Sequence, residues 1–542
     1  MRTEPTERTD RATDLLADPD LPALLDVLRR YETALAHHDR EVLDAAFVPG
    51  GAGAPVRAAG GAAAVGATQI AAGRAHGGPP PPRRPVRLHL RRVDGAWTAT
   101  LEGLRSDGTP TQQTQVWDGR DGWRVVAAHV SHGAPPAPRP PHDDQDDRDH
   151  QDDRDDLNAW RVHEPAGLEP SGEGPLAGVR VAVKDLYDVA GHARGAGNPT
   201  VLASAPPAAA HATALQRLVD AGAGVAGIAR TDELAFGLSG VNAHEGVVAN
   251  PVRPGRLAGG STSGPAAAVA AGEADLGLGT DTAGSIRVPA SYCGLLGLRL
   301  THGAVPLTGA QPLAPSFDAV GLLARELDVL RAGASVLVGG VGPDVPVERL
   351  LVPPTLLDLA DPTSRDAVVA GVLALALRAG CSPEAVDVVG AVELEEWFAA
   401  FRAVQAAEAY AEHAALLRDH PDAVSPDVRD RLLAGDLPAA EVDRHRTVLA
   451  RATGTIADLL PTGTALAIPS AAGPAPLATT RGAALDDVRA RTLRLGCLAS
   501  LAGLPALSLP TPLADGDPVG LCLVAGRGHD LSLISLAERT LW

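Results

Sequence analysis

The chain has 542 residues, of which 45% are hydrophobic and 21% charged, a composition typical of a globular protein with about two domains. Its formal net charge of −19 argues against a nucleic-acid partner, because phosphate contacts require a positive surface. No apolar run reaches the roughly 18 residues of a membrane span, and the polar N-terminus lacks the apolar core of a secretion signal. The four cysteines lie far apart, without the spacing of metal ligands or disulfides. We therefore expect a cytoplasmic protein with buried thiols and no membrane partner.

The N-terminal part of the sequence predicts a small α+β domain. Residues 1–19 are polar, and we expect a disordered tail there. From Leu21 apolar residues recur at helical spacing, which predicts two helices broken near His38 and Asp39. Extended segments follow at residues 86–92, 96–104, 112–117 and 123–130, and the Asp-Gly pairs between them indicate hairpins.

Helices followed by a curled antiparallel sheet, with the ending QTQVWDGRDGWRVVAAHVSH, resemble the NTF2-like (SnoaL-like) cone, and especially the small AtzH-like proteins of that fold. The resemblance covers about residues 20–133. It implies a cavity near Tyr31 and Arg57, and this domain could also join two copies of the chain into a homodimer. Because the stretch AFVPGGAGAPVRA departs from the aromatic-rich segment expected there, we favour a core position for Tyr31 and a surface position for Arg57.

A segment rich in proline and aspartate separates this domain from the rest of the chain. Residues 134–156 cannot bury a core, and residues 143–156 hold nine Asp against two Arg, a net charge of −7. Such a composition is typical of a self-repelling, disordered linker. We therefore expect residues 157–542 to form a separate domain that folds alone.

Two glycine-rich turns, each carrying a serine, stand at the centre of the second domain. The first, GGSTSGP, places Ser261 shortly before Pro265 and an Ala-rich run, which predicts a helix beginning near Pro265. The second, GTDTAGSIR, delivers Ser285 after a short apolar strand. The small residues before Ser285 let backbone N–H groups converge on an atom bonded to its oxygen, as an oxyanion hole requires.

The block from Gly259 through SIRVPASYCGLLGLR resembles the amidase signature family, serine hydrolases that use a Ser, cis-Ser, Lys triad. Its spacing agrees with that family, because Ser285 follows Ser261 by 24 residues and Lys184 precedes Ser261 by 77. The resemblance covers residues 157–542. It implies an α/β amidase signature fold, a mixed central sheet covered by helices, with Lys184, Ser261 and Ser285 as catalytic residues and a cis peptide bond before Ser261.

Lysine can accept a proton from a serine only when the amine is neutral. Lys184 follows the apolar run Val181-Ala182-Val183, so we expect a buried strand end where desolvation lowers its pKa. Ser261 would then relay the proton between Lys184 and Ser285.

The remaining site residues have supporting roles in this prediction. We expect backbone N–H groups of the second turn to bind the oxyanion, and a buried pair of opposite charges to hold that turn. Thr262 stands where the family often has serine, and it keeps the hydroxyl. The expected oxyanion and substrate contacts are Thr282, Ala283 and Gly284, and the supporting residues are Thr262, Asp281 and Arg287.

The predicted function is hydrolysis of a small-molecule amide through an acyl-Ser285 intermediate, with release of ammonia and without metal or cofactor. An amidotransferase-type subunit is one alternative, and the strong acidity and the fused N-terminal domain weigh against it. The other is a scaffold or binding protein organised by the NTF2-like domain, and the intact triad weighs against it. An aromatic content of 3% favours small polar amides or ureido acids over aryl amides.

Overall fold

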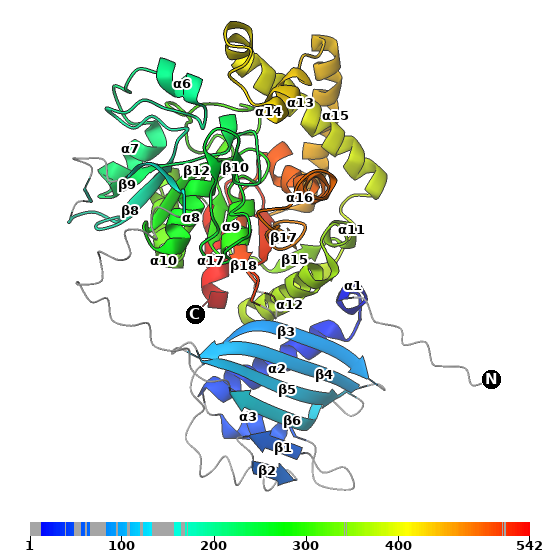
Figure 1. Ribbon diagram of the computed structural model, residues 1–542. Helices are drawn as coiled ribbons and strands as arrows, with labels where there is room; N and C mark the ends of the chain where they lie inside the picture. Colours follow the sequence, from blue (N-terminus) through cyan, green and yellow to red (C-terminus); the bar gives the residue numbers. More distant parts are fainter. Residues whose placement is uncertain are drawn as a thin grey trace.

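The computed structural model describes residues 12–37, 39–47, 56–59, 62–65, 83–93, 96–105, 109–119, 123–132, 157–163, 169–170, 172–340, 342, 344–511, 513 and 516–541. These residues form two sheets. The small N-terminal sheet with its own helices lies at the bottom of Figure 1, and a much larger sheet covered by helices lies above it. The large sheet mixes parallel and antiparallel strands, so the predicted α/β fold class, preceded by an α+β domain, is confirmed.

The N-terminal domain packs a mostly antiparallel sheet, in which only β1 and β6 of the described strands pair in parallel, against one long helix. Its described strands pair in the order β2-β1-β6-β5-β4-β3. Side chains alternate between buried and more accessible along β4 and β5, as expected of a sheet with one face on a core. Its elements are α1 (Ala12–Leu16), α2 (Leu21–His37), α3 (Arg40–Ala45), β1 (Val56–Ala59), β2 (Ala62–Val65), β3 (Arg83–Val93), β4 (Ala96–Arg105), β5 (Pro110–Asp118) and β6 (Arg124–His132).

Most predictions for this domain are confirmed. Two helices meet at Asp39, whose carboxylate caps α3 by accepting from Val42 N–H (3.2 Å). Tyr31 is buried, with its ring edge-to-face against Trp117 at 5.7 Å between centroids, so it belongs to the core as favoured. Arg57 lies on β1, but its side chain, the three Asp-Gly turns and the linker 134–156 fall outside the described residues.

The prediction of a disordered tail over residues 1–19 is wrong where the structure describes these residues, from residue 12 onward. Residues 12–16 form α1, and Leu16 is buried in the core although its neighbourhood is polar. The helix contacts α12 and β16 of the second part of the chain. Burial of apolar surface against these distant elements orders a segment that has too few apolar residues to be predicted from its own sequence.

The second part of the chain is built on an eleven-stranded sheet of described strands in the order β16-β15-β17-β19-β18-β13-β14-β12-β8-β9-β7. A two-stranded ribbon, β10 (Val241–Asn242) and β11 (Gly246–Val247), lies outside it. The sheet strands are β7 (Trp160–His163), β8 (Arg180–Lys184), β9 (Gly224–Ala229), β12 (Leu276–Asp281), β13 (Leu296–Arg299), β14 (Ala319–Ala324), β15 (Arg349–Val352), β16 (Ser382–Ala385), β17 (Thr464–Pro469), β18 (Ala506–Pro510) and β19 (Gly520–Ala525).

Helices cover this sheet, and a group of long helices stands at one end of it, at the upper right of Figure 1. Within the described ranges no helix is long and apolar enough to cross a membrane. All four cysteines are buried free thiols, as predicted. The helices are α6 (Pro199–Ser204), α7 (Thr213–Asp220), the short 3-10 helix η2 (Glu233–Ala235), α8 (Ser263–Ala271), α9 (Arg287–Cys293), α10 (Leu327–Val338), α11 (Pro354–Leu357), α12 (Pro362–Ala379), α13 (Ala391–Asp419), α14 (Pro426–Leu433), α15 (Ala439–Leu459), α16 (Ala483–Leu501) and α17 (Asp530–Leu541).

Helix α12 lies between the two parts of the chain. It contacts β17 and β19 of the large sheet, and it also contacts β3 and α2 of the N-terminal domain (Figure 1). Arg29 of α2 donates from Nε to the Leu377 carbonyl near the end of α12 (3.2 Å). From Ala367 to Leu377 every side chain of α12 is buried, as expected of a helix that is apolar all round. The N-terminal domain is therefore packed against the larger part.

Candidate active site

Lys184 is the last residue of β8, between its neighbours β9 and β12, and its side chain is fully buried. Its Nζ donates to Ser261 Oγ (2.8 Å) and to Thr280 Oγ1 (3.0 Å). The predicted buried strand end is thus confirmed. Lys184 is also the only lysine among the 542 residues, since every other basic side chain apart from histidine is arginine.

Burial lowers the pKa of Lys184 from 10.5 to about 7, although the carboxylates of Asp232, Asp318 and Asp281 oppose this shift. Arginine could not replace it in a proton-accepting role, because a guanidinium stays charged at any pH that proteins tolerate. A pKa near neutrality lets the Lys184 amine both accept and return a proton.

Ser261 is held by the loop that precedes α8. The peptide bond between Gly260 and Ser261 is cis, so the prediction for this bond is confirmed. Gly260 N–H donates to the Leu238 carbonyl (2.9 Å), and the Ser261 carbonyl accepts from Thr231 Oγ1 (2.8 Å). A Cβ atom on Gly260 would lie only 2.4 Å from Asp232 Oδ1, so only glycine fits before this serine.

Ser285 lies in the turn between β12 and α9, and it is buried. Its carbonyl accepts from Thr262 N–H (3.3 Å), which ties the two glycine-rich turns together. Gly284, directly before it, has φ +115°, a conformation that side chains with a Cβ rarely adopt. Thr262 keeps the supporting role predicted for its hydroxyl, which donates to the Thr280 carbonyl (3.3 Å).

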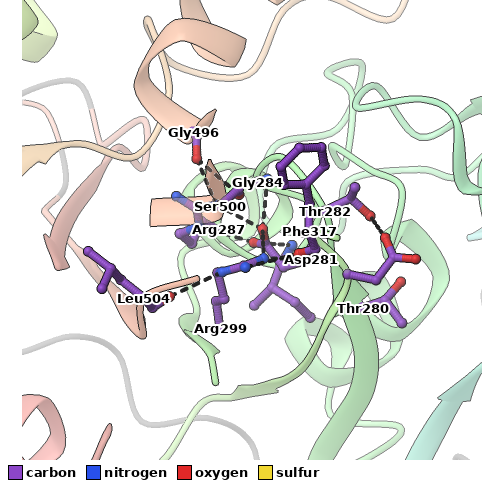
Figure 2. Close-up of polar contacts among 12 residues, drawn as sticks. Thr280, Asp281, Thr282, Gly284, Arg287, Arg299, Phe317, Gly496, Ser500 and Leu504 are labelled. Atoms are coloured by element: carbon purple, nitrogen blue, oxygen red, sulfur yellow. Dashed lines mark hydrogen bonds and ion pairs between the residues drawn. The ribbon is translucent and has the colours of Figure 1, made fainter. Parts of the chain in front are cut away.

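A buried charge cluster fixes the turn before Ser285, and Figure 2 shows Asp281 at its centre. Arg287 donates to both carboxylate oxygens of Asp281 (2.8 and 3.0 Å), so the predicted structural pair is present. Arg299 of β13 approaches the same carboxylate at 3.4 Å and donates to the Phe317 carbonyl (2.9 Å). Although burial alone would raise it, the two guanidiniums hold the pKa of Asp281 well below its usual range.

The backbone of this turn differs in one respect from the expected oxyanion hole. Gly284 N–H donates to Asp281 Oδ1 (2.8 Å), so that group is already engaged and does not point to a substrate. Thr282 is anchored through its hydroxyl, which donates to Asp318 Oδ1 (2.5 Å), and Ala283 has no left-handed backbone. The carboxylate that stabilises the turn thus takes one of the three predicted donors.

Several residues of the site were not identified from the sequence. Asp232 accepts from Ser239 N–H and Gly240 N–H (both 3.1 Å), next to Gly260, and burial raises its pKa. Thr280 is the second acceptor of Lys184, and Arg299 completes the charge cluster. Their signal in the sequence is weak, because nothing in their own segments indicates which distant groups they contact. One available signal was not used: Lys184 is the single lysine of the chain, and this alone singles it out as a residue that arginine cannot replace.

A cavity of about 260 Å³ adjoins these turns. Asp232, Leu238 and Val288 form the part of its wall that connects to the catalytic loops, through the contacts of Gly260 and the first turn of α9. Lys184, Ser261 and Ser285 themselves do not line it. The wall also includes residues of η2 and the loop after it, of α9, α14 and α16, and of the loop that precedes α16.

Comparison with known proteins identifies both parts of the chain. Residues 163–393 match the model of the Amidase family, and residues 16–135 match that of AtzH-like proteins. Over 408 residues the chain is 33% identical to Amidase 1 from Oryza sativa subsp. japonica, covering 68% of this chain and 91% of the rice protein. The chain belongs to the amidase family. The predicted fusion to an AtzH-like domain is confirmed as well.

Other relatives support a C–N hydrolase. The chain is 34% identical over 376 residues to the 1-carboxybiuret hydrolase subunit AtzE of Pseudomonas sp. (strain ADP), covering 66% of this chain and 82% of that subunit. A crystal structure of an amidase superposes with a TM-score of 0.65 at 30% identity, covering 73% of this chain and 94% of the other. An inhibitor-bound structure from a vestigial protein complex related to an s-triazine catabolic enzyme gives 0.65 at 28% identity, covering 73% and 93%. Related amidases thus occur in complexes.

The cytoplasmic location expected from the sequence is contradicted by other relatives. The translocon at the outer membrane of chloroplasts 64 from Pisum sativum is 31% identical over 399 residues, covering 68% of this chain and 67% of that protein. The outer envelope protein 64 of Arabidopsis thaliana chloroplasts is 40% identical over 174 residues, covering 32% and 30%. Two relatives are therefore named for the chloroplast outer membrane or outer envelope, and a polar N-terminus with unpaired cysteines does not establish a compartment.

Proposed function

We propose that this chain is a serine amidohydrolase that cleaves linear amides through an acyl-Ser285 intermediate and releases ammonia. The observation that carries the proposal is the buried contact between Lys184 Nζ and Ser261 Oγ (2.8 Å), at a lysine whose pKa is lowered to about 7 by burial. A neutral amine bound to a serine hydroxyl is the arrangement that a proton relay needs.

In the proposed reaction Ser285 Oγ attacks the amide carbon. Its proton passes to Ser261 Oγ, while the Ser261 proton passes to Lys184 Nζ. Collapse of the tetrahedral intermediate breaks the C–N bond, and the proton returns through Ser261 to the leaving nitrogen, so ammonia departs. Water then attacks the Ser285 ester by the same relay and releases the carboxylic acid. Every proton taken by Lys184 is returned within the cycle.

The oxyanion of each tetrahedral intermediate requires donors beside Ser285. We assign this role to the backbone N–H groups of Thr282 and Ala283, because the Gly284 N–H is engaged by Asp281. Asp281 and Arg287 keep the turn rigid and do not contact the substrate. Such preorganised donors cost no rearrangement when the negative charge develops.

The division of the chain is also part of the proposal, with an AtzH-like domain over residues 20–133, a linker over 134–156 and the amidase domain over 157–542. A homodimer formed through the AtzH-like domain would have to use surfaces other than those on β3 and α2 that contact α12.

Release of ammonia from primary amides by the full chain, with no second subunit added, tests this function. We expect Ser285→Ala to retain less than about one hundredth of the wild-type kcat/KM, because single catalytic groups usually contribute more than that. The matched control is Ser204→Ala, an exposed serine at the end of α6, which should keep full activity. Turnover by Ser285→Ala above that level, with the control unchanged, would assign the nucleophile elsewhere.

A further inference from the structure

Three arginines line the cavity beside the catalytic loops. Arg431 belongs to α14, Arg489 to α16, and Arg481 to the loop before α16. Arg481 is exposed and donates to the carbonyls of Ala478 (2.6 Å) and Thr480 (2.8 Å). Arg431 and Arg489 are half-buried and come from two different helices. Both side chains line the cavity.

In the described part of the chain, neither Arg431 nor Arg489 forms an ion pair with a carboxylate. The Nε of Arg431 is buried without a hydrogen-bond partner, and its guanidinium lies 5.6 Å from the centre of the Phe236 ring. Burial, together with the like charges of Arg431 and Arg402, lowers the pKa of Arg489 to about 10, although the carboxylates of Asp486 and Asp232 oppose this shift. Burial also lowers the pKa of Arg431, against the carboxylates of Asp427, Asp232, Glu233 and Asp486, but within the described residues none of these forms an ion pair with either guanidinium.

Each acidic residue of the same cavity has other partners or is open to solvent. The Glu233 carboxylate already has three partners. It accepts from Asn198 Nδ2 (2.7 Å), pairs with His244 Nε2 (2.8 Å) and accepts from the Ser425 hydroxyl. Asp232 accepts from two backbone N–H groups at the catalytic loop. Asp427 and Asp486 line the cavity but are exposed to solvent.

We propose that Arg431 and Arg489 bind the carboxylate of a short amide substrate whose acyl group ends in a carboxylate, an inference that rests on the proposed function. Guanidinium groups bind carboxylates through charge-assisted, often bidentate hydrogen bonds. Leu238, Val288 and Phe236 provide an apolar wall for the carbon chain between the two ends. A cavity of about 260 Å³ holds a small acyl chain of this kind.

A matched pair of primary amides isolates the carboxylate. Succinamate and butyramide differ in that one ends in a carboxylate and the other in a methyl group. The wild type should have the higher kcat/KM for succinamate. In Arg489→Met the ratio of the succinamate to the butyramide kcat/KM should fall at least about 30-fold, because the variant removes one partner of a charge pair in a desolvated site. Arg489→Lys, which keeps the charge, should lose less of this ratio. The control Arg418→Met removes an exposed arginine on α13 that pairs with Asp419, and it should leave the ratio unchanged.

A wild-type preference for butyramide, or a ratio that Arg489→Met does not change, would overturn the subsite. Failure of the proposed function gives a different result, namely turnover of both amides by Ser285→Ala.

Binding provides a readout that is independent of turnover. Succinate titrated into the Ser285→Ala protein in a calorimeter should bind, and adding Arg489→Met should weaken that binding at least tenfold. Equal affinity with and without Arg489, or no binding at millimolar succinate, would also refute the proposal.

Discussion

The buried Lys184 links catalysis to stability, and the replacement Lys184→Met separates the two. In the folded protein the lysine pKa is about 7, whereas an unfolded chain has the ordinary value of 10.5. Below pH 7 both states bind the proton, and the folded state is destabilised by about 5 kcal/mol, at 1.36 kcal/mol for each pKa unit. At pH 9 the folded amine is already neutral, and about 2 kcal/mol of this cost remains. The cost disappears above pH 10.5, so Lys184 makes stability rise with pH between about 7 and 10.5.

Lys184→Met removes this titration, along with the hydrogen bonds to Ser261 and Thr280. We therefore expect the stability of the wild type relative to the variant to improve by about 3 kcal/mol from pH 6 to pH 9. With an unfolding entropy of about 2.1 cal/mol/K per residue, this corresponds to about 3 °C in the difference of Tm. The comparison of two proteins at each pH cancels the contribution of all other groups.

Because Lys184 is the only lysine of the chain, its pKa can be measured directly. Protein labelled with ¹³Cε-lysine should give a single lysine side-chain resonance that titrates with a midpoint of about 7, and kcat/KM should rise with pH through the same midpoint. A folded-state midpoint above about pH 9, or a Tm difference that stays constant between pH 6 and pH 9, would refute the assignment of Lys184 as the neutral base.

Two further predictions concern the surroundings of the site. Asp281→Asn should lower the free energy of unfolding by about 3–5 kcal/mol, because the buried charges of Arg287 and Arg299 lose their carboxylate; an unchanged urea midpoint would contradict this role. A chain starting at residue 157 should still hydrolyse a simple amide but melt at a lower temperature, because α12 loses its cover from β3 and α2. Complete inactivity of that chain, measured by ammonia release, would mean that the N-terminal domain completes the catalytic site.

The segments around the site could be predicted because their structure depends on neighbouring residues. An apolar run places Lys184 at the end of β8, and Pro265 and the Ala-rich run after it produce α8, which begins at Ser263, two residues before the proline. Helices α2 and α3 and strands β3 to β6 of the N-terminal domain follow in the same way from apolar periodicity. In each case the signal lies within one element, where propensity and pattern agree.

The features of the fold and of the site that could not be predicted depend on contacts between residues far apart in the sequence. Residues 344–460 are mostly helical, yet β15 and β16 lie among those helices, and the Ser-Pro-Glu-Ala sequence of β16 has no strand pattern. It pairs in parallel with β15, which in turn pairs with β17, more than a hundred residues further along the chain. In the same way, the engagement of Gly284 N–H by Asp281 depends on how two arginines from different elements hold that carboxylate.

In the proposed function, reaction chemistry and substrate choice use different parts of this chain. A nucleophile, a base and oxyanion donors must be fixed relative to one another, and Lys184, Ser261 and Ser285 accordingly stand at strand ends and tight turns, within the residues that match the Amidase family. The far end of a substrate needs only a cavity wall, and Arg431 and Arg489 lie on α14 and α16, beyond the matched range. Helices at the edge can change their side chains without disturbing the sheet that aligns the relay. Replacement of Ser285 should therefore abolish hydrolysis of every amide, whereas replacement of Arg489 should change the order of preference among them.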